Sequence, residues 1–285
     1  CSLAYRLTRD DYYKQLMIDS SEALISRFDP AVGLIRSWNN KDGKANPFRV
    51  IIDNMMNLEM LFLASEFTGD SRYRDIAVTH ADNTLKNHFR ADNSCFHILC
   101  YDAGTGSVVT QKGGQGYSQT SAWSRGQSWG LYGFTMCYRF THDRRYLDRA
   151  VKSAEYFINP PNLPEDMVPY WDYYAPGIPD EPRDASAGAI AASALYELAL
   201  YSDPKYADAA DRMLASLSSD SYTAPVGENG NFILMHSVGS KPANSEVDVP
   251  IVYADYYYLE AIYRHRQFKK LKKHLWDGRL PALGK

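Results

Sequence analysis

The feature that most constrains the fold is a short turn, ending in an anchoring aromatic residue, that recurs four times along the chain. The copies span residues 8–13, 68–73, 141–146 and 201–206, and each ends in tyrosine. The anchoring tyrosines are about 60, 73 and 60 residues apart. Spacing of this size indicates one supersecondary unit used repeatedly.

Each turn is preceded by an apolar segment and followed by an amphipathic one. The apolar segments cover residues 55–67, 128–140 and 185–200. After the turns at 68–73 and 141–146, apolar residues recur at steps of three and four, which is the spacing of one helical face. The repeated unit is therefore predicted to be an α-hairpin.

The two helices of the hairpin differ in polarity. The first is apolar or small on most faces, whereas the second has one polar side. We therefore predict an all-α protein in which buried inner helices form a closed ring inside half-exposed outer helices, with a helical solenoid as the alternative. Long segments at 89–121 and 160–184 follow outer helices, so these loops are expected to meet on one rim and to carry function.

Composition narrows the function classes. Of 285 residues, 45% are hydrophobic, enough for a sizeable core, and no stretch approaches the roughly 20 apolar residues of a membrane span. The net charge of −3 supplies no basic field for nucleic acid. We expect neither a membrane nor a nucleic acid as partner.

The cysteines do not predict a metal site. Cys95 and Cys100 flank His97, but their spacing, without a second pair of ligands, is poor geometry for zinc. Cys137 lies in an apolar helical run and is expected in the core. Cys1 would suit a lipoprotein, yet the residues after it read as the end of a buried helix, so we favour a chain whose true start is missing.

Residues 116–129 hold the densest set of candidate binding groups. The segment combines two indoles, a guanidinium and two carboxamides. Aromatic faces stack on the C–H faces of sugars, and Arg and Gln side chains donate hydrogen bonds to carboxylates and hydroxyls. The segment therefore favours carbohydrate binding.

Three segments in order, residues 52–58, 116–129 and 169–187, carry a family resemblance: the chain resembles the unsaturated glucuronyl hydrolases, family 88 of the glycoside hydrolases. The resemblance implies an α6/α6 barrel of six hairpins. It covers nearly the whole chain but begins inside the family pattern, so we expect residues 1–285 to be one partial barrel domain that lacks roughly the first one to one and a half hairpins.

The family resemblance also implies an activity. Such enzymes act on oligosaccharides left by polysaccharide lyases and hydrate the C4=C5 double bond of the terminal unsaturated glucuronate. The expected partner is thus an unsaturated oligosaccharide, here from glycosaminoglycans, and no cofactor or metal is implied. The compartment stays open between bacterial periplasm and cytoplasm.

Two positions match the catalytic aspartates of the family. Asp53 matches the first, although an acidic residue at a helix start is also favoured by the helix dipole alone. Gln119 stands where the family has the second aspartate, and a carboxamide cannot cycle a proton near neutral pH. Besides an active enzyme, two alternatives therefore remain: an impaired homologue that binds sugars, and a helical-repeat interaction protein.

The resemblance also suggests substrate-binding residues. Arg183 matches the arginine that meets the uronate carboxylate, with a loop salt bridge as the alternative. Trp123, Trp129 and Trp171 are stacking candidates, although core packing would explain each of them equally well, and Trp38 could line the same rim. Arg125 and Gln127 belong to the family signature Arg-Gly-Gln-Ser-Trp, but could instead tie the loop to the helix start. Asp184 is expected to cap a helix N-terminus.

A late loop bears on substrate choice. Family members that favour sulfated glycosaminoglycans carry Ser-x-x-Ser-x-Lys there, and this chain has Ser237 and Ser240 with the lysine one place early, at Lys241. A sulfate contact and a merely polar turn are both compatible with this pattern.

Overall fold

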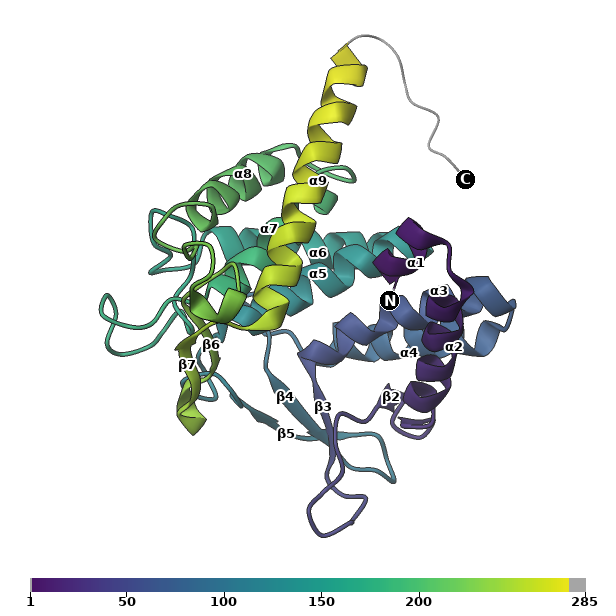
Figure 1. The fold of residues 1–285 in the computed structure, drawn as a ribbon. Helices are drawn as coiled ribbons and strands as arrows, with labels where there is room; N and C mark the ends of the chain where they lie inside the picture. Colours follow the sequence, from purple (N-terminus) through teal and green to yellow (C-terminus); the bar gives the residue numbers. More distant parts are fainter. Residues whose placement is uncertain (1, 277–285) are drawn as a thin grey trace.

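The computed structural model describes residues 2–276, in which helices pair along the chain as inner and outer partners (Figure 1). The inner helices are α1 (Ser2–Thr8), α3 (Leu58–Thr68), α5 (Ser124–Thr141), α7 (Ala185–Leu198) and α9 (Val252–Trp276). The outer helices are α2 (Asp11–Ile25), α4 (Ser71–Asn87), α6 (Arg144–Ile158) and α8 (Lys205–Leu217). The predicted hairpins are confirmed, with each repeated turn joining an inner helix to its outer partner.

The repeated turn works because its aspartate caps the outer helix. Asp10, Asp70 and Asp143 each accept a hydrogen bond from the backbone N–H two residues later. Such a cap satisfies a backbone donor that the first helical turn leaves without a partner. The same short sequence therefore ends one helix and starts the next in each hairpin.

The anchoring tyrosines join neighbouring hairpins. From the second turn onward, each phenol donates a hydrogen bond to a carboxylate on the preceding outer helix, and its ring is buried. The pairs are Tyr73 with Glu22, Tyr146 with Asp82 at 2.8 Å, and Tyr206 with Glu155 at 2.6 Å. The repeat thus fixes both the turn and the lateral packing of the outer layer.

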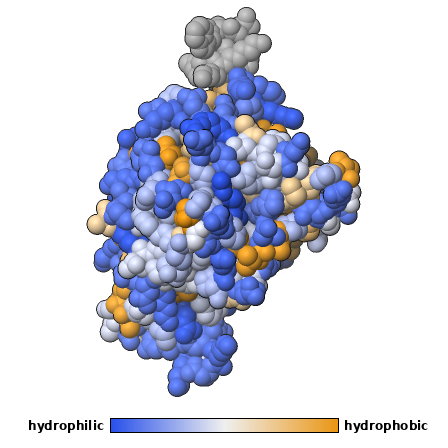
Figure 2. Space-filling view, turned by 90° about the vertical axis from the view of Figure 1, so that its left-hand side faces the viewer, coloured by the Kyte–Doolittle hydropathy of each residue, from blue (hydrophilic) through white to orange (hydrophobic). Residues whose placement is uncertain are grey.

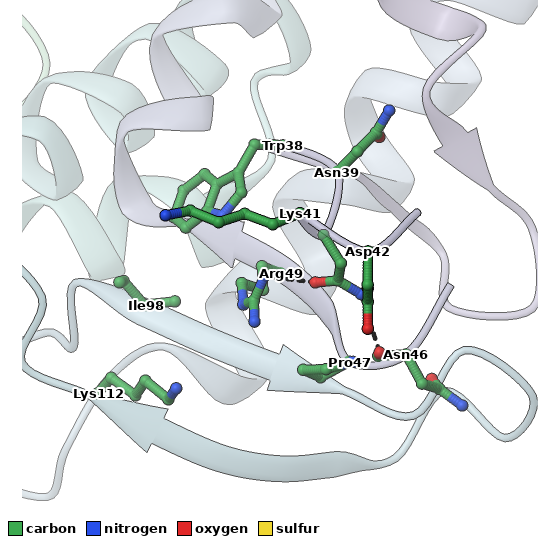
Figure 3. Close-up of a pocket in the computed structure, with 10 residues that line it drawn as sticks. Trp38, Asn39, Lys41, Asp42, Asn46, Pro47, Arg49, Ile98 and Lys112 are labelled. Atoms are coloured by element: carbon green, nitrogen blue, oxygen red, sulfur yellow. Dashed lines mark hydrogen bonds between the residues drawn. The ribbon is translucent and has the colours of Figure 1, made fainter. Parts of the chain in front are cut away.

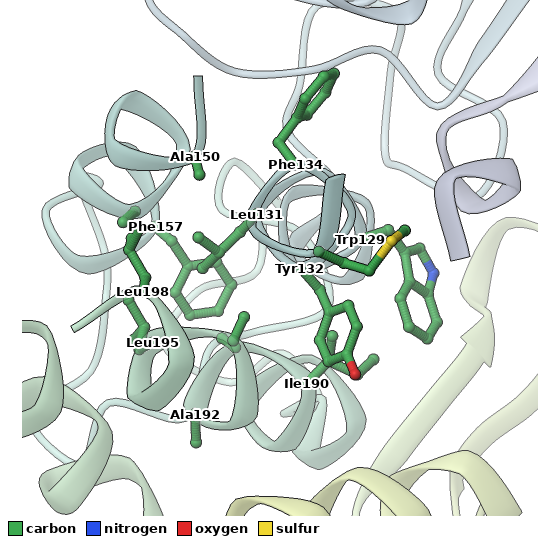
Figure 4. Packing of buried hydrophobic residues seen from close by; sticks show 14 of the residues in the cluster. Trp129, Leu131, Tyr132, Phe134, Ala150, Phe157, Ile190, Ala192, Leu195 and Leu198 are labelled. Carbon is green, nitrogen blue, oxygen red and sulfur yellow. The ribbon is translucent and has the colours of Figure 1, made fainter. Parts of the chain in front are cut away.

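The core extends over helices α3 to α9, and Figure 4 shows the part of it where α5, α6 and α7 pack together. All residues of α7 are buried, and small side chains let α5 and α7 approach closely. At Gly133 on α5, a Cβ atom would overlap the Met55 side chain, so this contact requires glycine. Cys137 is fully buried in the same helix, as predicted.

Charged residues from successive inner helices form a ladder inside the layer. Arg6 pairs with Glu59 at 3.6 Å, and Glu59 pairs with Arg139 at 3.2 Å. The ladder continues from Arg139 to Glu197 at 3.4 Å and from Glu197 to Arg264 at 2.9 Å. Arg6 is 52% exposed, but the rungs from Glu59 to Arg264 pair opposite charges at partly or largely buried positions, so the ladder favours one register of the inner helices.

Three small antiparallel sheets in the loops depart from a purely helical fold. They comprise β1 (Phe28–Asp29) with β2 (Leu34–Ile35), then β3 (Phe48–Ile51), β4 (Ile98–Tyr101) and β5 (Val108–Lys112), then β6 (Ser237–Ser240) with β7 (Ser245–Val249). Short 3₁₀ turns also occur, at η1 (Ile52–Asn57), η2 (Asn229–Asn231) and η3 (Lys241–Ala243). The sheets lie on the loop side of the helices, so they shape the rim (Figure 1).

Helix α9 is buried on one side only. It packs on α7, while Val252, Tyr256, Leu259 and Tyr263 form an exposed stripe along its other face. The face of the molecule that includes α8, β6 and β7 is mostly hydrophilic, with hydrophobic residues in separate patches (Figure 2). Among residues 2–276, no helix has both the length and the apolar character for crossing a membrane.

Candidate functional site

Asp53 lies in η1, where the chain leaves β3 and turns toward α3. Its side chain is 28% exposed, and its Oδ2 atom is buried without a hydrogen bond to any residue within 2–276. The polar neighbour of that oxygen is His97 Nε2, at 3.4 Å. Because most buried carboxylate oxygens are hydrogen bonded, this arrangement marks Asp53 as a candidate for chemistry.

His97 is oriented by a second contact. Its Nδ1 atom accepts a hydrogen bond from the Gln115 backbone N–H at 2.9 Å, which places the proton of a neutral imidazole on Nε2, facing Asp53. The ring packs on Trp123 with centroids 4.4 Å apart, and a Cβ at Gly114 would overlap it. Sequence reasoning weighed His97 only as a zinc ligand and missed this role.

The motif loops meet, as predicted from the repeat. Isolated backbone bridges pair Trp123 with Asp172 and Tyr170 with Arg183. The Ala185 N–H also donates to the carbonyl of His236 at 2.9 Å. Segments that lie far apart in sequence are therefore joined by their backbones at one rim.

Asp172 anchors the loop that carries Gln119. This carboxylate is fully buried and accepts hydrogen bonds from the Tyr117 N–H at 2.9 Å and the Ser121 hydroxyl at 2.8 Å, on either side of Gln119. Its other oxygen accepts from the Tyr174 N–H at 2.9 Å. Asp172 lies within the 169–187 segment, but the sequence alone did not identify it as a functional residue.

Gln119 itself is exposed at the tip of this loop. Its backbone carbonyl accepts a hydrogen bond from Arg90 at 2.8 Å, and its carboxamide makes no hydrogen bond to the part of the chain that the structure describes. Arg90 in turn stacks on Phe96, 3.9 Å from the ring centroid. The loop tip is thus held by its backbone, which leaves the Gln119 side chain available.

Arg125 is committed to structure. It is buried, pairs with Asp184 at 2.8 Å and donates to the carbonyls of Val238 and Gly239. Asp184 also accepts from the Ser186 N–H, which confirms the predicted cap of α7. Arg125 therefore joins the starts of α5 and α7 to β6.

Gln127 has a similar role. Its carboxamide accepts from the Cys95 N–H at 2.8 Å and donates to the carbonyls of Cys95 and Trp123 at 3.2 Å each. These bonds tie the loop before β4 to the first turn of α5. The interpretation of Gln127 as a tie between loop and helix describes these contacts.

Trp123 and Trp171 are both buried. Trp123 is sandwiched between His97 and the Arg125 guanidinium, which lies 4.6 Å from its ring centroid. Trp171 belongs to a small cluster with Val238, and its Nε1 donates to Glu181 at 2.8 Å. Neither indole presents an open face, so each contributes to the shape of the rim.

Arg183 lines a different part of the rim from Asp53. It pairs with Asp166 at 2.8 Å and lies over the Tyr170 ring at 4.7 Å. A cavity of about 440 Å³ opens beside it, with Tyr222 and His236 in the wall. Asp53 is not among the residues lining this cavity.

The late loop surrounds β6. Ser237 is fully buried, and Ser240 is partly exposed at the end of the strand. Lys241 Nζ lies 3.7 Å from Glu181 Oε2. The two serines thus differ in access, and Ser240 and Lys241 are the members of the predicted sulfate contact that reach the surface.

Trp38 is 38% exposed and lines a cavity of about 610 Å³ beside β3 and β4. Among residues 2–276, no group of three or more histidine, cysteine, aspartate or glutamate residues is arranged to hold a metal ion.

Comparison with known proteins places this geometry in a family context. Residues 1–272 match the model of Glycosyl Hydrolase Family 88. An unsaturated glucuronyl hydrolase of Formosa agariphila is 49% identical over 269 residues, which cover 93% of this chain and 67% of the relative. The chain thus spans about two thirds of that protein's length.

Solved structures are similar as well. An unsaturated glucuronyl hydrolase specific for heparin superposes with a TM-score of 0.90 at 45% identity, covering 94% of this chain and 72% of that one. A variant of the Streptococcus agalactiae unsaturated glucuronyl hydrolase complexed with dGlcA-GalNAc6S superposes with a TM-score of 0.75 at 34% identity, covering 92% and 64%. The α/α-barrel prediction is confirmed by these likenesses.

Proposed function

Because the chain belongs to glycosyl hydrolase family 88, we propose that it hydrolyses unsaturated uronyl oligosaccharides released from glycosaminoglycans by polysaccharide lyases. The support is the family match together with one observation, the Asp53 carboxylate whose buried Oδ2 has no hydrogen bond within residues 2–276 and lies 3.4 Å from His97 Nε2. The relatives named as unsaturated glucuronyl and unsaturated chondroitin disaccharide hydrolases agree with this substrate class.

The reaction consumes one water. An acid protonates C4 of the C4=C5 double bond, and the positive charge that develops at C5 is shared with the ring oxygen. Water adds at C5 and gives up a proton to a base, and the resulting hemiketal opens and releases the next sugar. The reaction differs from displacement at the anomeric carbon by two carboxylates, so one group that both donates and recovers a proton is central.

Asp53 is the residue assigned to that proton transfer. His97 Nε2 lies 3.4 Å from Asp53 Oδ2, so a proton on Nε2 faces the carboxylate electrostatically and Oδ1 is assigned to substrate or water. His97 is a positioning residue, since its ring is enclosed by Trp123 and Gly114. The pair supplies an acid–base group with a fixed direction.

Arg183 is assigned to a carboxylate or another anion of the substrate. Its Nη1 atom is engaged by Asp166, but the guanidinium borders an open cavity and has further N–H donors. Ser240 and Lys241 are assigned to a sulfate on the sugar next to the uronate. The part of the rim that supports these residues is shaped by buried side chains, namely those of Trp123, Arg125, Gln127, Trp171 and Ser237.

Gln119 supports a second candidate function. Its carboxamide can orient water or bind a hydroxyl, but it cannot exchange a proton. If the reaction requires an acid at this loop tip, the chain is an impaired homologue that binds unsaturated oligosaccharides without efficient turnover.

The discriminating experiment follows the loss of the ultraviolet absorbance of the conjugated uronate. Wild type, Gln119→Asp and the control Gln111→Asp are compared on an unsaturated disaccharide. Gln111 is an exposed residue of β5, so the control introduces the same charge without touching the loop tip. An active enzyme degrades the substrate in wild type, and an impaired homologue gains roughly 10²–10⁴-fold only in Gln119→Asp.

Each outcome assigns one function. If wild type turns over the disaccharide and Gln119→Asp does not increase the rate, Asp53 together with water is sufficient for the proton transfers. If none of the three proteins consumes the double bond, but wild type still binds the disaccharide in a titration, the binding function stands and the hydrolase proposal fails.

A further inference from the structure

A cavity outside the Asp53 site lies between the 38–47 loop and the open face of the three-stranded sheet. Its volume is about 610 Å³. The residues that line it are Trp38, Asn39, Asn40, Lys41, Asp42, Asn46, Pro47, Arg49, Ile98 and Lys112 (Figure 3). This cavity is separate from the one beside Arg183.

The cavity is positively charged although the whole chain carries −3. Lys41, Arg49 and Lys112 contribute three cations, against the single carboxylate of Asp42. That carboxylate pairs with Lys44 outside the cavity lining, at 3.3 Å. Lys41 and Lys112 are both exposed and approach from opposite sides, one from the loop and one from β5 (Figure 3).

The cationic groups sit on a built scaffold. Arg49 donates from Nη1 to Asn40 Oδ1, which fixes its guanidinium. The Asn40 amide donates in turn to the carbonyls of Lys44 at 2.6 Å and Asn46 at 2.8 Å, closing the loop around the cavity. Asn40 is itself almost fully buried, so the loop has a polar core that sets its shape.

Trp38 supplies the one large aromatic surface of the cavity. Its indole is 38% exposed, unlike the buried indoles of Trp123 and Trp171. An exposed indole beside cations and amides is a combination suited to a sugar ring that carries anionic groups, since the ring packs on the indole and the anions meet the cations.

The strands beneath the cavity run on to the Asp53 site. Arg49 and Ile51 share the open face of β3, and Asp53 follows two residues after Ile51. At about 3.3 Å per residue, Arg49 is at most ~13 Å of chain from Asp53. Ile98 in the cavity wall directly follows His97, so both strands of the cavity floor lead to the reacting pair.

We propose that this cavity is a distal subsite for an anionic sugar, sulfated or carboxylated, located further along the same oligosaccharide than the sugar released at Asp53. The subsite selects longer, charged products of polysaccharide lyases over disaccharides. Trp38 packs on the sugar ring, and Lys41, Arg49 and Lys112 meet its anionic groups. The inference rests on the proposed function for the identity of the substrate, but the subsite can be measured without turnover.

The binding experiment uses the Asp53→Asn background, so that no substrate is consumed. Titration calorimetry measures the dissociation constants of an unsaturated sulfated tetrasaccharide and of the matching disaccharide. Lys41→Ser with Lys112→Ser should weaken tetrasaccharide binding roughly two- to thirtyfold, because each exposed charge contact is worth about 1.4- to 5-fold. Trp38→Ala should weaken it by about two- to tenfold.

The decisive quantity is the ratio of the two dissociation constants. The subsite predicts that the variants change the tetrasaccharide constant more than the disaccharide constant, and that the difference shrinks for a chemically desulfated tetrasaccharide and at high ionic strength. The control Lys86→Ser with Lys152→Ser removes two exposed lysines from outer helices α4 and α6 and should leave the ratio unchanged.

Equal losses for tetrasaccharide and disaccharide, or equal losses in the control, overturn the subsite. Failure of the proposed function looks different, since the protein with Asp53 intact would then consume no double bond from a substrate of either length. A ratio that shifts in an inactive protein supports the subsite in the binding homologue.

Discussion

The two sides of the loop-bearing rim differ in how far their functional side chains are buried and hydrogen bonded. At the junction of α5 and α7, Arg125, Asp172 and Asp184 are buried and fully engaged by one another or by backbone groups. On the sheet side, Asp53 keeps a buried oxygen without a hydrogen bond, and Trp38 keeps an exposed face.

This difference separates assembly from chemistry. The residues of the strongest sequence signature, 123–129, form the junction that joins loops and helices. On the sheet side, the Asp53 carboxylate and the Trp38 indole are not taken up by such contacts. Motif strength therefore indicates which residues hold the rim together, whereas an unsatisfied carboxylate and an exposed indole indicate where we propose that the substrate is bound and converted.

The largest effect is expected from Asp53→Asn. The substitution keeps the shape of the side chain but removes the group that cycles a proton, so kcat/KM on an unsaturated disaccharide should fall about 10²–10⁴-fold. The midpoint of thermal unfolding should stay within a few degrees, since Asp53 makes no hydrogen bond through its buried oxygen. A large loss of stability with retained specific activity would move Asp53 to the structural side of the comparison.

The opposite result is expected from Arg125→Ala. It leaves Asp184 buried without its cation and removes the hydrogen bonds from Arg125 to the Val238 and Gly239 carbonyls, so the free energy of unfolding should fall by about 3–5 kcal/mol in urea titrations. Arg183→Ala is the matched control. Arg183 directly precedes Asp184, the residue that Arg125 pairs with, but its own partner is Asp166 at a partly exposed site. It should cost no more than about 1 kcal/mol.

The two arginines also separate in binding. Arg183→Ala should weaken binding of any unsaturated uronide by roughly ten- to a hundredfold, as expected for loss of a hydrogen bond to a charged group. If Arg183→Ala is as destabilising as Arg125→Ala and binds substrate normally, the assignment of the two residues must be exchanged.

The hairpins were predictable because their determinants are local. An aspartate that caps within two residues and a tyrosine at a fixed offset leave the same trace in every repeat. The sheets were not, since strands of two to five residues carry little pattern and β5 is exposed along its whole length. Such strands depend on pairing with distant partners rather than on their own sequence.

The site was predictable only in part, for a related reason. Asp53 could be identified from its neighbours in sequence. His97 could not, because its role depends on Asp53, Gln115 and Trp123, which converge only in the fold. For Trp123 and Trp171 the sequence left stacking and core packing open, and the structure shows that both indoles are buried.

The next prediction concerns the pH dependence of the free energy of unfolding. Burial lowers the pKa of His88 to about 4 and that of His80 to about 3, below the value near 6.5 of an exposed imidazole. Both residues lie beneath the sheet side of the rim and fold in the neutral form. At a pH between the folded-state pKa of each histidine and about 6.5, the unfolded chain binds more protons than the folded chain. The free energy of unfolding is therefore at its full value above about pH 6.5 and falls as the pH drops.

The expected loss between pH 7 and pH 5 is on the order of 2 kcal/mol for each of the two histidines. Urea unfolding across this range gives the slope, and His88→Gln should make it shallower whatever its effect on stability at pH 7. His142→Asn, at an exposed left-handed position that asparagine tolerates, is the control and should keep the wild-type slope. An unchanged slope in His88→Gln would show that folding does not lower the pKa of His88.

The smallest effect is expected at the edge of the rim, from Ser240→Ala combined with Lys241→Ala. Lys241 is partly exposed and 3.7 Å from Glu181, so its loss should change the free energy of unfolding by no more than about 0.5 kcal/mol. The same variant should weaken binding of a sulfated unsaturated disaccharide by about two- to fivefold at low salt and less at high salt. Its effect on the unsulfated disaccharide should be smaller.

Lys205→Ala, which removes an exposed lysine paired with Glu155 on the outer layer, controls for the lost charge. Equal losses for both disaccharides in the double variant would remove sulfate recognition from this loop and leave Lys241 as a structural partner of Glu181.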